Sequence, residues 1–203
     1  ASNPGTERFT SAPLLGMVYD LDNRPCAGVK IEEDTRPLST SDSAGRFLLA
    51  DLARGPHRLV ARKSGYETLE AEIDFEDETQ VLYLCLVSLS QLLSRAEGAI
   101  RSGDWESATE LLERAGRINP KVPLAEFLWA VMEYNRNKDL PAKQRLLRLL
   151  SDGTDDVAVY LLLADLYELR LGRPDLASAA LRQVLNRTRD PSVMERLERL
   201  TKP

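Results

Sequence analysis

The hydrophobic periodicity of the chain changes once, at about Ser88, and this change limits the folds that the chain can adopt. Before it, from Pro13 to Val87, apolar and polar residues alternate in short runs separated by Asp, Asn, Pro and Gly. Such runs are typical of consecutive strands and turns. After it, apolar residues recur at helical spacing, and nearly every break carries Gly, Pro or Asp. The sequence therefore predicts an α+β chain of two domains, with the strands first and the helices second.

The first part predicts seven strands: Leu14–Tyr19, Gly28–Glu32, Leu38–Thr40, Arg46–Ala50, Gly55–Arg62, Tyr66–Phe75 and Thr79–Val87. In the sixth, apolar residues at 69, 71, 73 and 75 alternate with acidic ones. One buried and one wet face indicates an antiparallel β-sandwich. The run Val81–Val87 is apolar on both faces, so we expect a central strand or one that the following domain covers.

The second part contains a repeat of helix pairs. Three equivalent turns carry Trp105, Leu140 and Pro174 as their third residues, 35 and 34 positions apart. The pairs that flank these turns are Leu89–Arg101 with Trp105–Ile118, Leu124–Arg136 with Pro141–Leu150, and Val157–Leu171 with Pro174–Asn186. A last amphipathic segment, Ser192–Leu200, is expected to cap the array. The predicted domains are a flexible segment 1–12, a sandwich 13–87, and helical repeats 88–203.

The helical part resembles the tetratricopeptide repeat family, whose 34-residue unit has small residues where paired helices cross. The first pair matches at Leu92, Ala96, Gly103, Asp104, Trp105, Ala108, Leu112, Ala115, Ile118 and Pro120. The third matches at Tyr160, Leu163, Ala164, Tyr167, Gly172, Ala177, Leu181 and Val184, with about one extra residue before its turn. In the second, Phe127, Ala130, Tyr134, Leu147 and Leu150 fit, but Lys143 stands where a small residue is expected. We therefore expect looser packing, or an altered crossing angle, in the second pair.

The β part resembles the carboxypeptidase regulatory-like family, a seven-stranded prealbumin-type sandwich. The resemblance rests on residues 16–20, 25–31, 40–47, 52–60 and 63–66. Gly55–Tyr66 alone also resembles the short PEGA-type β module. Membership of the first family implies no catalytic residues in the module itself.

Charge and composition limit the classes of partner that the chain is expected to bind. The net charge is −5; residues 1–88 carry 9 Lys+Arg and 15 Asp+Glu, whereas residues 89–203 carry 18 and 17. This balance does not favour a nucleic-acid partner. No run approaches the roughly 20 apolar residues of a membrane span. The chain begins at Ala1, as after removal of a targeting segment or after trimming. We expect an extracytoplasmic location (periplasmic, lipoprotein or secreted), although a cytoplasmic one stays open.

The chain has few residues in patterns typical of catalytic or metal-binding sites. The single histidine, His57, has no second His or Cys at ligand spacing, and no nucleophile elbow, metalloprotease helix or phosphate loop occurs. We therefore expect no catalysis, no cofactor and no metal. The acidic turn 74–78, with the acidic residues 20, 22 and 32–34, leaves calcium open, but a solvated turn is the simpler interpretation. Cys26 and Cys85 are either joined in a disulfide or two free thiols.

The family resemblance implies a groove lined by the first helix of each pair, where a peptide or helix of a protein partner would lie. The residues at groove positions are Glu97, Ile100, Arg101, Leu128, Met132, Asn135, Arg136, Leu161, Asp165, Glu168 and Leu169. The alternative is that these residues pack helix against helix or face water. The predicted function is thus that of a non-catalytic interaction or scaffold protein, which we expect in a bacterial cell envelope. A rigid component of an envelope assembly or homo-oligomer, and an accessory region of a larger envelope enzyme, are the alternatives.

Overall fold

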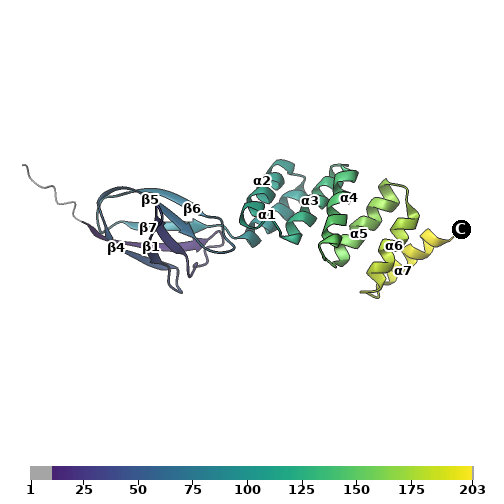
Figure 1. Ribbon diagram of the computed structural model, residues 1–203, viewed down its shortest axis with the longest axis horizontal. Helices are drawn as coiled ribbons and strands as arrows, with labels where there is room; N and C mark the ends of the chain where they lie inside the picture. Colours follow the sequence, from purple (N-terminus) through teal and green to yellow (C-terminus); the bar gives the residue numbers. More distant parts are fainter. Residues whose placement is uncertain (1–10, 203) are drawn as a thin grey trace, which may run out of the picture. The chain divides into compact units, whose positions relative to one another are not determined.

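The computed structural model describes residues 11–202 and is an α+β structure, with seven strands in two sheets followed by seven α-helices and one π-helical turn in that range (Figure 1). It divides into two compact units. The first runs to Leu92 and includes Arg117–Asn119; the second comprises Leu93–Gly116 and the residues after Asn119. The predicted flexible segment 1–12 lies almost wholly outside the described residues, and its last residue, Ala12, already begins a strand.

The strands form two sheets with the orders β4-β1-β7 and β3-β2-β5-β6. Their bounds are β1 Ala12–Asp20, β2 Lys30–Glu33, β3 Arg36–Thr40, β4 Arg46–Leu52, β5 Gly55–Arg62, β6 Leu69–Phe75 and β7 Val81–Leu86. The core between them consists of large apolar side chains such as Leu14, Ile31, Phe47, Leu59 and Phe75, all under 5% exposed. The alternation predicted for the sixth strand is confirmed.

Two expectations about the strand β7 are wrong. It pairs parallel to β1, from Leu15 with Val81 to Asp20 with Leu86, so the sandwich is not wholly antiparallel. It is also an edge strand of its sheet and not a central one, and Val81 is 46% and Tyr83 61% exposed. The apolar run predicted burial on both faces, but only Leu84 and Leu86 are fully buried.

A glycine turn locks the β1 strand to the start of β4. Gly45 has φ +76°, and its carbonyl accepts a hydrogen bond of 2.8 Å from the Val18 amide. A Cβ at Gly45 would overlap the carbonyl of Val18 and lie 3.2 Å from the amide nitrogen of Cys26. This position therefore needs glycine both for its left-handed backbone and for the close approach of two chain segments.

We predict that Gly45→Ala lowers the free energy of unfolding by about 2–4 kcal/mol, because a left-handed backbone cost of about 1–2 kcal/mol adds to the backbone overlap. Gly28→Ala is the matched control: φ is +69°, but nothing lies within 4 Å of the added Cβ. It is expected to cost only about 1–2 kcal/mol. Urea unfolding measures both, and equal losses would contradict the role of the close approach.

The first helix, α1 Leu89–Ser102, begins with a reciprocal cap. The Ser88 hydroxyl accepts from the Gln91 amide at 3.2 Å, and the Gln91 side chain accepts from the Ser88 amide at 3.1 Å. This Ser-x-x-Gln pattern satisfies two otherwise unpaired helix donors. Gln91 also donates to Asp22 at 2.9 Å, within the first unit.

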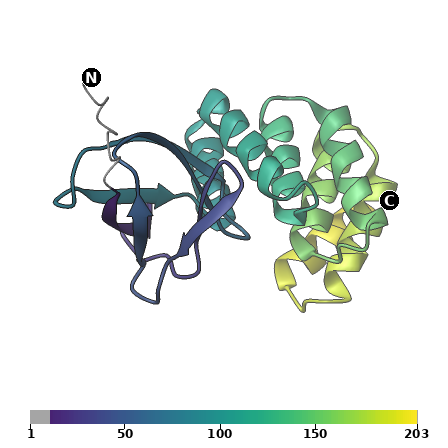
Figure 2. The ribbon, with the colours of Figure 1, turned by 60° about the vertical axis from the view of Figure 1, so that its left-hand side comes forward.

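Three helix pairs and a terminal helix follow one another in the chain (Figure 2). After α1 come α2 Trp105–Ile118, α3 Pro123–Asn135, α4 Asp139–Ser151, α5 Val157–Asp165, α6 Pro174–Leu185 and α7 Pro191–Thr201. The turn inside each pair contains one left-handed residue, Gly103, Asn137 or Gly172. These residues stand 34 and 35 positions apart. In the described residues, no helix has the length and apolar character to span a membrane.

The extra residue predicted in the third pair is taken up by a π-helical turn, η1 Leu166–Arg170, directly after α5. The Leu171 amide donates to the Leu166 carbonyl, five residues back, at 2.9 Å. A π turn accommodates one residue more than an α turn without ending the helix. It therefore explains why the left-handed residue of the third turn, Gly172, follows that of the second, Asn137, by 35 positions.

The second pair packs in a register one residue earlier than the sequence indicated. Ala142, not Lys143, is the fully buried small residue of α4, and Leu146 and Leu149 are buried with it. Leu147, which was expected in the core, is 43% exposed. The reason for expecting looser packing or an altered angle, Lys143 at the crossing, is therefore wrong, because Ala130 and Ala142 are each 0% exposed in one core.

Candidate functional site

The helical unit has an apolar hollow of about 520 Å³ where α3, the end of α4 and the start of α5 meet. Its walls are Val122, Pro123, Leu124, Phe127, Leu149, Thr154, Asp156, Ala158 and Val159. Leu149 and Val159 are under 5% exposed, whereas Leu124 is 50% exposed. The hollow therefore has an apolar floor and a half-exposed leucine that a ligand can contact.

A second hollow of about 530 Å³ adjoins the first. The two share Val122, Pro123, Leu149 and Thr154. The second also has charged residues of both signs, namely Lys121, Glu126, Arg148 and Asp152. Together the hollows form an amphipathic groove in which an apolar side chain can be buried beside polar groups that bind a backbone.

Two helices begin at this groove, and each has a residue typical of a helix N-terminus. Pro123 is the first residue of α3, where its missing amide hydrogen costs nothing. Asp156 caps α5 by accepting from the Ala158 amide at 2.8 Å. The first helices of the second and third pairs thus both begin at the groove.

The predicted groove residues fall into three groups. Those that are exposed are Glu97, Arg101, Asn135, Arg136 and Leu169, and those that are partly exposed are Leu161, Asp165 and Glu168. Those that are buried, at 2–6% exposure, are Ile100, Leu128 and Met132. The buried three pack between helices, as the alternative interpretation held, and none of the eleven lines the apolar hollow.

Sequence reasoning missed Leu124 and Phe127, which do line the hollow. For Phe127 the cause is the same shift of one residue that misplaced α4. Ala130, which already fits the family pattern, stands 34 positions after Ala96, and Ala142 is its buried counterpart on α4. A step of 34 moves the predicted groove positions Leu128 and Met132 to Phe127 and Val131, which are partly exposed, but it does not account for Leu124.

Arg136 lies elsewhere, at an open hollow of about 730 Å³ along α2. Its other walls are Gly103, Asp104, Trp105, Glu106, Thr109, Glu110 and Glu113. Arg101 forms an ion pair of 2.7 Å with Glu97 on its own helix. Arg101 is therefore paired within its own helix, whereas Arg136 lines the open hollow.

An arginine of α4 links two carboxylates of α3. Arg145 contacts Glu126 at 2.8 Å and Glu133 at 3.0 Å, and its guanidinium lies 5.2 Å from the centre of the Trp129 ring. Burial lowers the pKa of Arg145, but the hydrogen bonds to the two carboxylates outweigh it and raise the pKa. This cluster holds the two helices of the second pair together.

The terminal helix α7 covers the predicted acidic groove positions of the third pair. Arg196 contacts Asp165 at 2.7 Å and Glu168 at 2.6 Å, and its side chain is only 20% exposed. Val193 of α7 is buried in the same helical core, and Leu197 and Leu200 pack against it. One guanidinium thus pairs with both acidic side chains, and the three residues together keep one negative charge.

We predict that Arg196→Ala lowers the free energy of unfolding of the helical unit by about 1–3 kcal/mol, since two half-buried carboxylates lose their shared cation. Arg199→Ala, an exposed site on the same helix, is the control and should cost less than about 0.5 kcal/mol. Thermal unfolding followed by circular dichroism compares them. Equal stability of the two variants would show that the cluster contributes little.

In the sandwich, His57 joins three segments. One ring nitrogen contacts a Glu33 oxygen, and Nε2 lies 2.7 Å from the Ala53 carbonyl. Both neighbours are acceptors, so only the doubly protonated ring can donate to both. Burial lowers the pKa of His57, but the hydrogen bonds to Glu33 and Ala53 and the charges of Glu33 and Asp74 outweigh it and raise the pKa. His57 thus links the strand β5 to Glu33 of β2 and to the carbonyl of Ala53.

We predict that the chain loses stability as the pH rises through the raised pKa of His57. The folded state binds this proton more tightly than the unfolded state, whose pKa is about 6.5, so the contribution is complete below that pH and disappears above the folded pKa. Urea unfolding at several pH values measures the slope, and His57→Gln should abolish it. Because the chain has one histidine, an unchanged slope in that variant would contradict the assignment.

The other candidates in the sandwich are a disulfide, a metal site and the acidic turn 74–78. Cys26 and Cys85 are not joined in a disulfide in the structure, and burial raises the pKa of Cys26. Over residues 11–202, no three His, Cys, Asp or Glu side chains are grouped closely enough to hold a metal ion. Asp77 of the acidic turn accepts from the hydroxyl and amide of Thr79, so the turn binds its own backbone.

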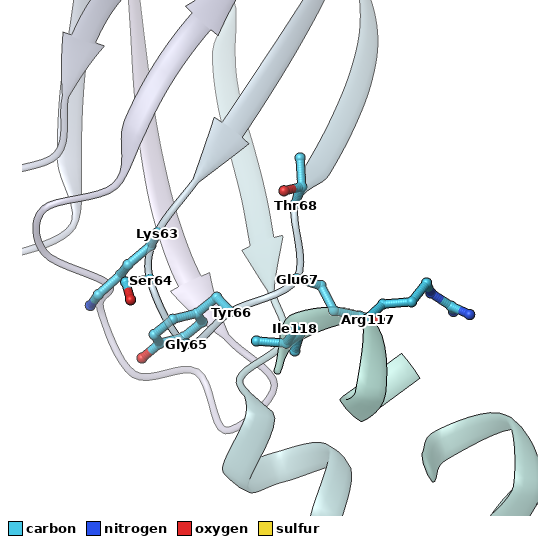
Figure 3. Close-up of a pocket in the computed structure, with 8 residues that line it drawn as sticks. All are labelled: Lys63, Ser64, Gly65, Tyr66, Glu67, Thr68, Arg117 and Ile118. Atoms are coloured by element: carbon cyan, nitrogen blue, oxygen red, sulfur yellow. The ribbon is translucent and has the colours of Figure 1, made fainter. Parts of the chain in front are cut away.

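A polar hollow of about 420 Å³ borders the loop between β5 and β6 (Figure 3). It is lined by Lys63, Ser64, Gly65, Tyr66, Glu67, Thr68, Arg117 and Ile118, all within the first unit. The loop backbone is already engaged, because the Glu67 amide donates to Val87 at 2.9 Å and the Leu89 amide to Gly65 at 2.8 Å. The Lys63 ammonium lies over the Tyr66 ring at 4.7 Å. This loop therefore supports the start of α1.

No protein-family model and no curated protein matches the chain. Among solved structures, the TPR domain of Arabidopsis OM64 is similar at 17% identity, with a TM-score of 0.49 over 56% of this chain and 93% of that one. The Bacillus anthracis TIE protein is similar at 16% identity and a TM-score of 0.30, over 39% of this chain and 17% of that one. A Rhodococcus opacus 3-chlorocatechol 1,2-dioxygenase is similar at 15% identity and 0.31, over 42% and 62%. The identities and scores are low for all three.

Proposed function

We propose that this chain is a non-catalytic interaction protein, whose helical unit binds an extended peptide or a helix of a partner protein. The observation that carries the proposal is the amphipathic groove at the start of α3 and α5, with Leu124 half exposed beside a buried apolar floor. An apolar anchor buried in a pocket with a polar rim is the usual energetic centre of a protein interface.

We further infer that the helical unit is a tetratricopeptide-like array. The left-handed turn residues Gly103, Asn137 and Gly172 support this, since they recur at nearly one 34-residue step. Fully buried alanines at Ala130, Ala142 and other crossings support it as well. The groove then lies along the first helices of the pairs, as in the family.

The sandwich is proposed to be a carboxypeptidase regulatory-like module that acts as a spacer or anchor in a bacterial cell envelope. Its two sheets and the left-handed glycine turn at Gly45 support this proposal. Fractionation of the producing cells tests the location, and recovery in the cytoplasm alone would overturn it.

The test of the groove begins with a photo-crosslinking amino acid at Leu124, in the cells that make the protein. Leu147 on α4 is the control position, because its exposure of 43% is close to the 50% of Leu124 but it lines neither hollow. We expect mass spectrometry to identify one partner at position 124 and not at 147. Equal crosslinking at both positions would indicate nonspecific contact and overturn the proposal.

With that partner purified, Leu124→Glu is predicted to weaken binding at least tenfold. Burial of a leucine contributes about 1.5–3 kcal/mol, and a tenfold change in affinity corresponds to about 1.4 kcal/mol. Leu147→Glu should leave the affinity unchanged, and both variants should unfold at the wild-type temperature because both sites are exposed. Calorimetric titration against the partner measures the affinity.

A further inference from the structure

The two outer faces of the sandwich differ in chemistry. The β3-β2-β5-β6 sheet carries ion pairs on its surface, Arg58 with Glu70 and Arg62 with Glu32. The β4-β1-β7 sheet instead exposes large apolar side chains: Leu15 at 56%, Leu48 at 46%, Val81 at 46% and Tyr83 at 61%. The register places Leu15 directly beside both Leu48 and Val81, so these side chains form one row across the three strands. Such a contiguous exposed apolar row marks a surface of interaction.

The edge strands of the two sheets also differ in the charged residues and prolines that they carry. Edge strands are normally protected from pairing by charges, proline or bulges. β4 has Arg46 and Asp51, β3 has Arg36 and Pro37, and β6 has three acidic residues. β7 has no charged residue and no proline, and it runs beside β1 without a bulge. Among the described strands, β7 is therefore the edge best suited to accept another strand.

We propose that a second copy of this chain pairs with β7 edge to edge, antiparallel, about a two-fold axis at Tyr83, so that the two three-stranded sheets become one six-stranded sheet. This interface is on the sandwich and goes beyond the groove of the helical unit.

The sequence of β7 is compatible with pairing to itself. In an antiparallel pair centred on Tyr83, that residue lies opposite its own copy, and Leu82 lies opposite Leu84 of the other copy. Outward residues thus meet outward residues and inward ones meet inward ones, as the alternation of side chains requires. In a two-fold contact any charged residue near the axis faces its own charge. β7 avoids this repulsion because it is uncharged.

The length of the contact favours this register. Beyond β7, the Val87 carbonyl and the Leu89 amide already bond to Glu67 and Gly65. A register centred on Leu84 would require Val87, whereas one centred on Tyr83 does not. A contact of one short strand is well below the standard interface of about 1,200–2,000 Å², so we expect a weak, concentration-dependent dimer.

Sedimentation of the full chain over a range of concentrations tests the proposal, together with Tyr83→Lys and Tyr83→Glu. Wild-type protein is expected to form dimers and no larger species. Each variant alone places like charges opposite each other and should raise the dimer dissociation constant at least tenfold. An equimolar mixture of the two variants places Lys opposite Glu and should recover the dimer. Recovery also shows that neither variant has simply failed to fold.

The control is Leu48→Lys, on the same apolar face but on the far strand β4. Edge pairing predicts that this variant dimerises as the wild type does. If Leu48→Lys weakened the dimer as much as Tyr83→Lys, the two copies would stack face to face, and the proposal would be wrong. A wild-type chain that stays monomeric at every concentration, or a mixture that does not recover the dimer, would also overturn it. None of these outcomes tests the proposed groove of the helical unit, so the two proposals can fail independently.

Discussion

Close contact between helix backbones at alanine is the constraint on which the helical unit depends. Ala130 and Ala142 in the second pair, and Ala164 and Ala177 in the third, are all 0% exposed. A larger side chain at these crossings would separate the helices or force a different angle. Because each alanine fixes which face of its helix points inward, it also decides which residues remain at the surface. The position of the groove, and the exposure of Leu124 at its rim, follow from these crossings.

Much of the fold could be predicted from the sequence because its signals are local. Alternation and helical periodicity, together with glycine, asparagine and proline at the breaks, gave all seven strands and all seven helices within a few residues. The extra residue in the third pair was also predicted from spacing, and η1 contains it. Local patterns state which face of an element is apolar and where the element ends.

The remainder could not be predicted because it depends on neighbours distant in sequence. An apolar run does not reveal whether a strand is central, and β7 has a partner on one side only. In the second pair two alternative faces of α4 were nearly equally apolar, one with Ala142 and one with Leu147, and only tertiary packing selects between them. The groove positions predicted on α3 were counted in the same shifted register. The two families to which the sandwich and the helical unit were assigned by resemblance stay predictions.

The π turn has a consequence for how the second and third pairs are joined. Arg170, the last residue of this turn, donates to Asn137 at 2.8 Å, and its guanidinium lies 5.2 Å from the centre of the Tyr134 ring. The π turn of the third pair thereby supplies a contact to the second pair. Neighbouring helix pairs of the array need not be interchangeable.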